Sequence, residues 1–406
     1  MSYYPRTLEN AINSLSLQFP ALLLSGSRQT GKTTLLKAVS ASNRKYVTLD
    51  DLSLRELARH DPKLFLQQFE PPLFIDEIQY APELFPYLKM RIDEQRENGL
   101  FWLSGSQQFQ MMQRITETLA GRIAILTLSG FSQAEFYQQA TTSLPFLPSF
   151  ELLRKKSVTR YTPETLFQYL WQGSMPIPAV YPQTDWHVFY NSYLQTYLQR
   201  DIRELSQVAN LSVFTRFIRV CAARTGQILN YSDLARDTDI SQQTAKNWLS
   251  LLESCSLVYL LPPWHSNTTK RLIKTPKIYF LDTGLCAFLT HWTSSETLQH
   301  GAMNGAIFET FVVGEILKSY WYNAQNPNFF YYRDKDGKEI DLLIEQNNRL
   351  FPIEIKLAAT VKKEWVRNFS VLDRFSQARD VGVVICLSPE PQIIDNQNLA
   401  IPITLL

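Results

Sequence analysis

An eight-residue motif near the amino terminus constrains this 406-residue chain more than any other feature. The segment GSRQTGKT at positions 26–33 fits the Walker A pattern, G-x-x-x-x-G-K-[ST], at every fixed position. Glycine makes up only 14 of the 406 residues, so chance predicts about 0.003 such matches in the chain. An apolar run precedes the motif at 21–25 and a helix-compatible segment follows it at 34–40. This is the strand–loop–helix order that a phosphate-binding loop requires.

Each fixed residue of the motif has a physical task. Gly26 and Gly31 let the backbone curl so that successive N–H groups point at phosphate oxygens. Lys32 places a positive charge on the β- and γ-phosphates, and the Thr33 hydroxyl can ligate Mg²⁺. The alternative interpretation is an ordinary glycine-rich turn before a helix. We predict a nucleotide site formed by Gly26, Ser27, Arg28, Gln29, Thr30, Gly31, Lys32, Thr33 and Thr34.

A second motif, typical of Walker B, follows at a suitable distance. The apolar segment 72–75 ends in two acids, Asp76 and Glu77. At the carboxyl end of a parallel strand, Asp76 can support the Mg²⁺ shell and Glu77 can polarise the attacking water. Two acids that only cap the next helix are the structural alternative. The phosphate-binding loop upstream favours the catalytic interpretation.

Three further residues are candidates for sensing the γ-phosphate. Ser104 and Ser106 end the fourth apolar segment, and either hydroxyl can contact the phosphate or the water. Arg122 precedes the fifth apolar segment and is a sensor candidate, although an exposed or salt-bridged arginine is the commoner arrangement.

The first 130 residues alternate short apolar runs with helical patterns, which is typical of a parallel α/β sheet. Beyond position 131 the pattern becomes helical and aromatic-rich, and after 277 it becomes mixed again. Expected strands in the first part are 21–25, 45–50, 72–76, 100–105 and 122–128.

Composition narrows the class of protein. Hydrophobic residues make up 45% and charged residues 19%, with a net charge of +2, so the chain is a packed globular protein and not a polycation. The four cysteines are far apart, which argues against a disulfide framework or a zinc ribbon. The first 15 residues lack the apolar run of a signal peptide, and no 18-residue apolar run occurs. We expect a cytoplasmic protein without a membrane span.

The segment 231–252 is typical of a helix-turn-helix. We expect a helix at 231–236 capped by Ser232, a tight turn at 237–240, and a second helix capped by Ser241. Strands expected at 257–261 and 274–280 would complete a winged helix. The apolar residues of the second helix recur at helical spacing, and they are Ala245, Trp248, Leu249 and Leu252.

The other face of that second helix is a candidate DNA-binding surface. The span 240–280 carries five basic residues, including Lys270, Arg271 and Lys274, against one acid. Winged helices also serve as protein-binding or structural modules, so a protein partner remains the alternative. The proposed contacts are Gln242, Gln243, Lys246 and Asn247.

Acidic residues in the last third can form a metal site. The strand expected at 339–345 contains Asp341, and the next strand contains Glu354 and Lys356. A hairpin with a turn at 346–349 brings these three together, and Glu309 on an expected helix can join them. Two carboxylates attract a hard divalent cation, and a nearby ammonium can activate water. The alternative is a surface salt bridge of Lys356.

Nearly the whole chain resembles bacterial and archaeal AAA-type P-loop ATPases that carry a C-terminal domain of unknown function (DUF4143). The resemblance rests on GSRQTGKTTLL, PPLFIDEIQ, LSGSQQF and LAGRIAILTLSGFSQAEF, and later on WQGSMPIPAV and GAIFETFVVGEI. It implies that Lys32, Thr33 and Asp76 bind MgATP and that Glu77 activates water. The family usually has Thr-Gly-Ser where this chain has Ser-Gly-Ser at 104–106, so which hydroxyl acts stays open.

The C-terminal cluster is similar to the metal core of PD-(D/E)xK nucleases. That resemblance implies Asp341 and Glu354 as ligands of a second divalent metal and Lys356 as the electrostatic catalyst. Ile340 stands where the fullest pattern has proline. The expected architecture is a P-loop ATPase core (1–130), a helical lid or connector (131–205), a winged helix-turn-helix (206–276) and a restriction-nuclease-like α/β domain (277–406).

We therefore expect an ATPase that is coupled to a DNA-binding module and a nuclease-like domain. The alternative is a nucleotide-controlled switch that binds a protein partner through an inactive C-terminal domain. The oligomeric state, the biological pathway and the source of any arginine finger stay open.

Overall fold

The structure is a computed structural model that describes residues 3–106, 115, 117–140, 143–155, 161–181, 183–198, 211–266 and 275–406. The chain divides into two compact units. Unit 1 contains Met1–Ser143, Ser254–Leu257 and Trp321–Gln325, and unit 2 contains Leu144–Glu253, Val258–Tyr320 and Asn326–Leu406. Each unit has its own sheets, so each is described by itself.

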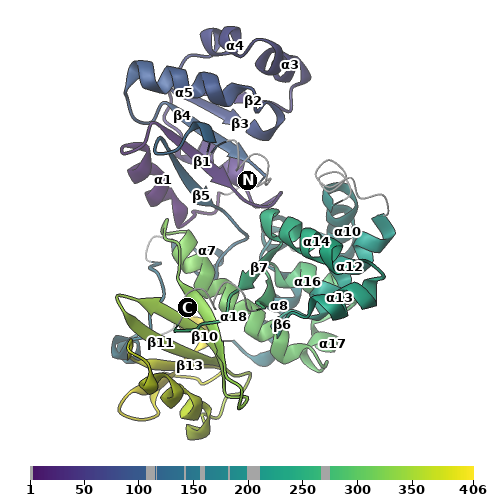
Figure 1. The fold of residues 1–406 in the computed structure, drawn as a ribbon, viewed down its shortest axis with the longest axis vertical. Coiled ribbons are helices and arrows are strands. Elements are labelled where there is room, and N and C mark those ends of the chain that lie inside the picture. The colour runs from purple at the N-terminus through teal and green to yellow at the C-terminus, as the bar shows by residue number, and fades with distance from the viewer. Residues whose placement is uncertain are drawn as a thin grey trace. The chain divides into compact units, whose positions relative to one another are not determined.

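Unit 1 is built on a five-stranded parallel sheet in the order β2-β3-β4-β1-β5 (Figure 1). The three central strands, β3, β4 and β1, are completely buried, which is typical of a parallel sheet covered on both faces, whereas the edge strands β2 and β5 are partly exposed. The five expected strands are confirmed as β1 Ala21–Ser25, β2 Lys45–Thr48, β3 Leu73–Asp76, β4 Phe101–Gly105 and β5 Ile123–Thr127.

Helices cover both faces of this sheet because successive side chains of a strand point to opposite sides. Leu22 and Leu24 of β1 pack into a cluster with α1 and α2, whereas Leu23 packs into a cluster with α3, α4 and α5. Figure 1 shows α1 and α5 on either side of the strands. The helices are α1 Leu8–Ser16, α2 Lys32–Val39, α3 Leu52–His60, α4 Pro62–Gln68, α5 Leu84–Gln95 and α7 Gln133–Phe136, with a short turn of helix, η1, at Ile78–Tyr80.

The strand register brings the ends of four strands to one edge of the sheet. Ser25 pairs with Gly105, and Thr48 pairs with Asp76, so β1, β2, β3 and β4 all end at the same level. Carboxyl ends of parallel strands are where open α/β sheets bind ligands. The loop of the first motif begins at this edge, and the acidic pair of the second motif, Asp76 and Glu77, lies there.

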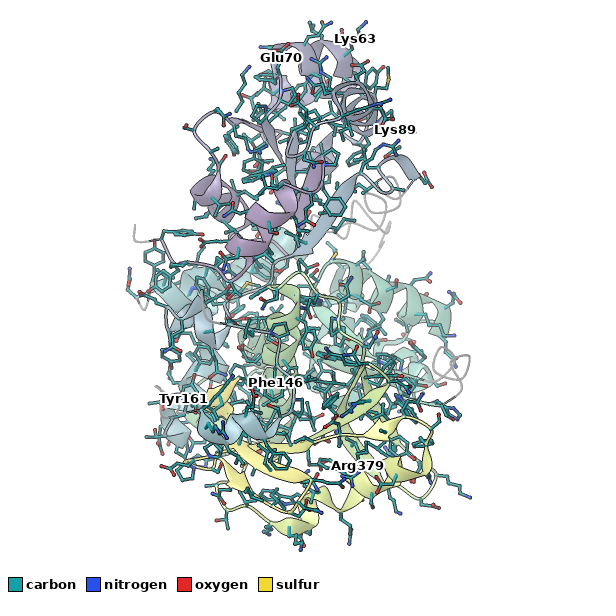
Figure 2. All side chains as sticks on the ribbon, turned by 90° about the vertical axis from the view of Figure 1, so that its left-hand side faces the viewer. Lys63, Glu70, Lys89, Phe146, Tyr161 and Arg379 are labelled. Atoms are coloured by element: carbon teal, nitrogen blue, oxygen red, sulfur yellow. The ribbon has the colours of Figure 1, made fainter. Side chains whose placement is uncertain are left out.

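Unit 2 begins with helices that lead into a small three-stranded sheet of order β6-β8-β7. Phe146, labelled in Figure 2, ties the entering segment to α18: its N–H donates to the Ser319 hydroxyl at 2.9 Å and its carbonyl accepts from the Tyr320 hydroxyl at 3.0 Å. The helices up to the second sheet are η3 Phe150–Arg154, α8 Pro163–Gln172, α9 Pro176–Val180, α10 Trp186–Tyr193, η4 Leu194–Leu198, α12 Leu211–Ala223, α13 Tyr231–Thr238, α14 Gln242–Ser254, α16 Thr283–Leu289, α17 Ser295–Gln299 and α18 Asn304–Trp321.

The central part of unit 2 runs helix–strand–helix–helix–strand–strand from α12 to β8. The strands are β6 Gln227–Ile228, β7 Val258–Leu261 and β8 Lys277–Phe280, and β8 lies between the other two. β8 begins directly after the expected domain boundary at 276, yet it pairs with strands on the other side of that boundary. Lys270, Arg271 and Lys274 fall outside the described residues.

The expected cap of the first helix in this region is wrong. Asn230, not Ser232, caps α13, because the Asn230 side chain accepts hydrogen bonds from the N–H groups of Ser232 and Asp233. The helix also continues to Thr238, and the turn is made by Asp239 in the left-handed conformation. The second cap is confirmed: the Ser241 hydroxyl accepts from the N–H of Thr244 at 3.0 Å.

A seven-stranded mixed sheet closes unit 2, in the order β14-β15-β13-β11-β10-β9 with β12 beside β11. Its core packs against the η5 helix, Lys363–Arg374. The strands are β9 Phe329–Arg333, β10 Glu339–Gln346, β11 Arg349–Ile355, β12 Ala378–Arg379, β13 Gly382–Cys386, β14 Gln392–Ile393 and β15 Asn398–Pro402. Among the helices in the described part of the chain, none has the length and apolar character needed to cross a membrane.

Candidate nucleotide site and C-terminal charged cluster

The phosphate-binding loop connects the end of β1 to the start of α2. Gly26 has φ +146°, and a Cβ there would lie 1.9 Å from the carbonyl oxygen of Leu128, so only glycine fits. Gly31 has φ +90° at the amino end of α2, a conformation that other residues rarely adopt. The backbone of 26–33 is therefore shaped by the two glycines that the motif requires.

The Lys32 side chain folds back over this loop. Its ammonium donates to the carbonyls of Gly26 at 3.0 Å and Ser27 at 2.8 Å, and the side chain is buried. A lysine held over the loop in this way lies where the β- and γ-phosphates of a nucleotide would accept the same hydrogen bonds.

Asp76 stands at the centre of a set of hydroxyl donors. Thr33 donates to its two carboxylate oxygens at 3.0 and 2.9 Å, Ser104 also donates to it, and Tyr46 of β2 donates at 3.1 Å. Burial and the charge of Asp76 raise the pKa of Tyr46 to about 12, so the phenol stays a donor. The sequence did not predict a role for Tyr46, because no motif surrounds it. Its contact with Asp76 arises only because β2 pairs with β3.

Glu77 follows Asp76 with a left-handed backbone, φ +57°. Its carboxylate accepts a hydrogen bond from the Gln79 side-chain amide. Such a backbone is costly for a residue other than glycine and is found where the surroundings impose it, often at functional sites. This backbone turn follows directly after Asp76 in the chain. The Gln79 side-chain amide is the group that orients the Glu77 carboxylate.

The two candidate serines differ in their surroundings. The Ser104 hydroxyl is bonded to Asp76, whereas the Ser106 hydroxyl is buried and has no hydrogen-bond partner among the described residues. The structure thus distinguishes the two hydroxyls: that of Ser104 is bonded to Asp76, and that of Ser106 is unpaired within the described residues. Gln107 and the residues up to 114 lie outside the described residues.

The structure does not bring Arg122 to the loop. Arg122 precedes β5, and its carbonyl accepts from the N–H of Ala21 at the amino end of β1, the opposite edge of the sheet. Its guanidinium pairs with Asp93 of α5 at 2.7 Å, which is the salt-bridge arrangement. Within its own chain, Arg122 therefore lies away from Gly26–Thr33.

A buried arginine that sequence reasoning missed supports the loop from behind. Arg6 donates to the carbonyl of Thr30 at 3.0 Å and to that of Ser129 at 3.0 Å. It also forms an ion pair with Glu135 at 3.0 Å, and Glu135 is completely buried. The guanidinium thus joins the amino-terminal segment, the phosphate-binding loop and the segment after β5. No motif marks Arg6, because its partners lie up to 129 positions away (135 − 6).

The expected DNA-contacting residues lie on the exposed face of α14. Gln243 donates to the Asn247 side chain at 2.9 Å, and Gln242 donates to the Ser232 hydroxyl at 3.0 Å. The Lys246 ammonium lies 5.3 Å from the centre of the Tyr231 ring. All four side chains of the predicted set are exposed, so this face of the helix is polar and carries one positive charge, that of Lys246.

In unit 2 the expected acidic residues do come together. The β10–β11 hairpin register places Asp341 opposite Glu354, and Asp341 accepts from the N–H of Ile355 at 2.9 Å. Lys356 pairs with Glu354 at 2.6 Å and with Asp341 at 4.0 Å. One two-residue turn, Asn347–Asn348, in which both residues have positive φ, sets this register.

Glu309 of α18 reaches the same cluster. It accepts a hydrogen bond from the Tyr279 hydroxyl at 2.6 Å and pairs with Lys277 at 3.3 Å. Sequence reasoning counted Lys277 only as one of several basic residues. Burial and the nearby charge of Asp341 raise the pKa of Glu309 to about 7, and the same two causes raise that of Glu354 to about 8.

The lysines that pair with these acids bear on the metal site expected from the sequence. Over the ranges that the structure describes, no group of three or more His, Cys, Asp or Glu side chains has a geometry that could hold a metal ion. The carboxylates of the cluster are paired with lysine side chains instead.

Comparisons with known proteins identify the family. The family model of the AAA domain matches residues 18–137, a domain of unknown function (DUF8612) matches 163–296, and a second domain of unknown function (DUF4143) matches 304–406. The uncharacterized protein Rv2008c of Mycobacterium tuberculosis is 30% identical over 343 residues, which cover 84% of this chain and 71% of that protein. The chain belongs to this family of AAA-domain proteins with a C-terminal DUF4143 domain.

More distant proteins extend the likeness. The uncharacterized protein MJ1637 of Methanocaldococcus jannaschii is 23% identical over 377 residues, covering 86% of this chain and 77% of that protein. Among solved structures, the Walker-type ATPase PABY2304 of Pyrococcus abyssi is 16% identical and covers 71% of this chain and 96% of that protein, with a TM-score of 0.45. A signal-transduction ATPase of Pyrococcus horikoshii is 13% identical and covers 79% and 47%, with a TM-score of 0.26. At these TM-scores nothing about this chain's activity follows from the two structures.

Proposed function

We propose that this AAA-domain protein hydrolyses MgATP at the carboxyl edge of the unit 1 sheet. The observation that carries the proposal is the meeting of Thr33 and Asp76 beside the glycine-shaped loop, with Glu77 next in the chain. A hydroxyl and a carboxylate are the hard oxygen ligands that Mg²⁺ accepts in nucleotide sites. The donor set therefore fits the metal that the family implies.

Each residue of the site has one task in this reaction. The loop N–H groups and the Lys32 ammonium bind the phosphates, while Thr33 and Asp76 would hold Mg²⁺, which neutralises phosphate charge when it is bound. Glu77 orients a water and accepts its proton, with its carboxylate positioned by Gln79. Ser106 offers its hydroxyl toward the γ-phosphate or that water.

We propose further that α12, α13 and α14, together with β6, β7 and β8, form a winged helix that contacts DNA. Support comes from the helix–strand–helix–helix–strand–strand order and from the exposed face of α14 with Gln242, Gln243, Lys246 and Asn247. Such a face can bind base edges or phosphates in a groove. Nucleotide turnover in unit 1 would then control how unit 2 binds DNA.

The C-terminal domain, on this proposal, has a nuclease-like arrangement: a hairpin carries Asp341, Glu354 and Lys356, and a helix carries Glu309. The second candidate function is a nucleotide-controlled switch for a protein partner, with this domain inactive. The pairing of the cluster's carboxylates with lysines favours that second candidate.

The deciding experiment is ATP turnover by the purified protein with and without duplex DNA, with Lys32→Ala as the blank. The proposal predicts that turnover rises when DNA is added and that Lys32→Ala abolishes it. Turnover that ignores DNA would favour a protein partner. Undiminished turnover by Lys32→Ala would contradict the assignment of the ATP site itself.

A further inference from the structure

A buried lysine lies inside the C-terminal acidic cluster. Lys277 opens β8, the middle strand of the three-stranded sheet, and its side chain is 3% exposed. Its ammonium nitrogen is 2.6 Å from a carboxylate oxygen of Glu339, 3.3 Å from one of Glu309 and 4.0 Å from one of Asp341. Carboxylates from α18 and β10 therefore surround the ammonium in place of water.

The local structure holds this lysine in place. Residues two apart on a strand point to the same face, so Lys277 and Tyr279 both reach Glu309. The Tyr279 hydroxyl donates to the same Glu309 oxygen that Lys277 contacts, at 2.6 Å. The Tyr331 ring covers the ammonium with its centre 5.8 Å away. A buried ammonium is tolerated only with such partners, because removing its charge from water is costly.

The carboxylates of the cluster pair with two lysines, and Glu339 also lies 3.9 Å from the guanidinium of Arg333. Lys277 forms ion pairs with Glu309 and Glu339, and Lys356 forms one with Glu354. Asp341 lies 4.0 Å from both ammonium groups. Every carboxylate of the cluster thus has a lysine nitrogen within 4.0 Å.

A divalent cation would compete with this arrangement. Mg²⁺ and Mn²⁺ sit close to their oxygen ligands, about 2.0–2.2 Å away. A metal held by Glu309 and Asp341 would have to lie against the Lys277 ammonium, which contacts those two side chains already. Two positive centres at that spacing in a largely buried site repel each other strongly, so the ammonium and the metal exclude each other.

We propose that Lys277 is the resident cation of the C-terminal cluster: its ammonium takes the place of a divalent metal between Glu309, Glu339 and Asp341. The cluster then takes up no Mg²⁺ or Mn²⁺ while β8 keeps this position. Metal-dependent cleavage of a phosphodiester cannot proceed there in this state. The inference concerns unit 2 alone and does not depend on ATP hydrolysis.

Binding of Mn²⁺, followed by calorimetry and by electron paramagnetic resonance, tests the proposal. All proteins carry Asp76→Asn, which removes a metal ligand of unit 1. The protein with Lys277 is expected to show no Mn²⁺ binding that depends on Asp341. The variant Lys277→Met with Glu339→Gln removes the lysine and one of its partners. It is expected to bind one Mn²⁺ at least 10-fold more tightly than the protein that keeps Lys277. Adding Asp341→Asn to that variant should remove the binding.

A matched control uses another buried ion pair of unit 2, Lys318 with Glu315. Lys318→Met with Glu315→Gln also removes a buried lysine and its 2.5 Å partner, but outside the cluster, and should gain no Mn²⁺ binding. Circular dichroism establishes that each variant is folded. A folded Lys277 variant without Mn²⁺ binding overturns the proposal. Mn²⁺ binding by the protein that keeps Lys277, lost on Asp341→Asn, overturns it even when the Lys277 variant fails to fold.

Discussion

The Thr33 hydroxyl lies 3.0 and 2.9 Å from the two carboxylate oxygens of Asp76, although 43 residues separate the two in the chain. Thr33 lies in the first turn of α2 and Asp76 ends β3, so the contact joins the two nucleotide motifs directly. In this structure the carboxylate takes hydrogen bonds from hydroxyl groups; in the MgATP complex the same oxygen atoms would face the metal.

The first prediction separates Asp76 from the tyrosine that orients it. Asp76→Asn should abolish measurable ATP turnover, because it removes a charged oxygen ligand. Tyr46→Phe removes only the phenol that donates to Asp76 at 3.1 Å, and should lower turnover by about 10-fold. Steady-state phosphate release over a Mg²⁺ series is the measurement. A Tyr46→Phe loss as large as that of Asp76→Asn would contradict this division of roles.

The second prediction concerns Glu77. Glu77→Gln keeps the size of the side chain but cannot accept a proton, so turnover should fall by roughly 10²–10⁴-fold. Nucleotide affinity should stay within a few-fold of the wild type, since Lys32 and the loop still bind the phosphates. A fluorescent ATP analogue and phosphate release measure the two quantities separately. Loss of affinity together with turnover would assign Glu77 to binding.

The third prediction addresses the brace behind the loop. Arg6→Ala leaves the buried Glu135 without its cation, so the free energy of unfolding of unit 1 should fall by about 3 kcal/mol. ATP affinity should fall with it, because Arg6 also supports the Thr30 carbonyl. Urea unfolding and ATP titration measure the two effects. The double variant Arg6→Ala with Glu135→Ala should recover part of the stability; equal destabilisation by the single and double variants would argue against the ion pair.

The fourth prediction tests the α14 surface. Lys246→Ala should weaken DNA binding to a similar degree across sequences and reduce the salt slope of the affinity by about 1, because a phosphate contact releases one counterion. Fluorescence anisotropy over a salt series measures this. Lys63→Ala is the control: that lysine is exposed on α4 of unit 1 and is labelled in Figure 2. Equal effects of the two variants would remove α14 as the DNA-contacting face.

The fifth prediction follows from the pKa of Glu354, which burial raises from 4.5 to about 8. Between these pH values the folded protein keeps a proton that the unfolded chain has lost, so the stabilisation present below pH 4.5 disappears as the pH rises to 8. Glu354→Gln should therefore reduce the fall in unfolding free energy between pH 5 and pH 8 by on the order of 2 kcal/mol. Urea unfolding at the two pH values measures it. Glu364→Gln, an exposed residue on η5, should leave the fall unchanged; no difference between the two variants would contradict the prediction.

Short-range patterns predicted much of the fold. The five strands of unit 1 and the β10–β11 hairpin follow from runs of apolar residues and from turn residues next to one another in the chain. The cap at Asn230 shows the limit of such patterns. Asn230 and Ser232 are both good capping residues, and which of them begins the helix depends on where the preceding strand β6 ends.

The nucleotide loop is the part that the sequence by itself determined. Its residues are contiguous, and its shape follows from two glycines whose backbone angles no other residue tolerates well. Only the tertiary structure decided which distant groups act on it: Tyr46 beside Asp76, Arg6 behind Thr30, and Lys277 within the C-terminal acids. It also put Arg122 at the far edge of the sheet. The physical reason is that charges and hydroxyls interact over a few ångströms in space, and spacing along the chain does not specify which of them the packed strands bring together.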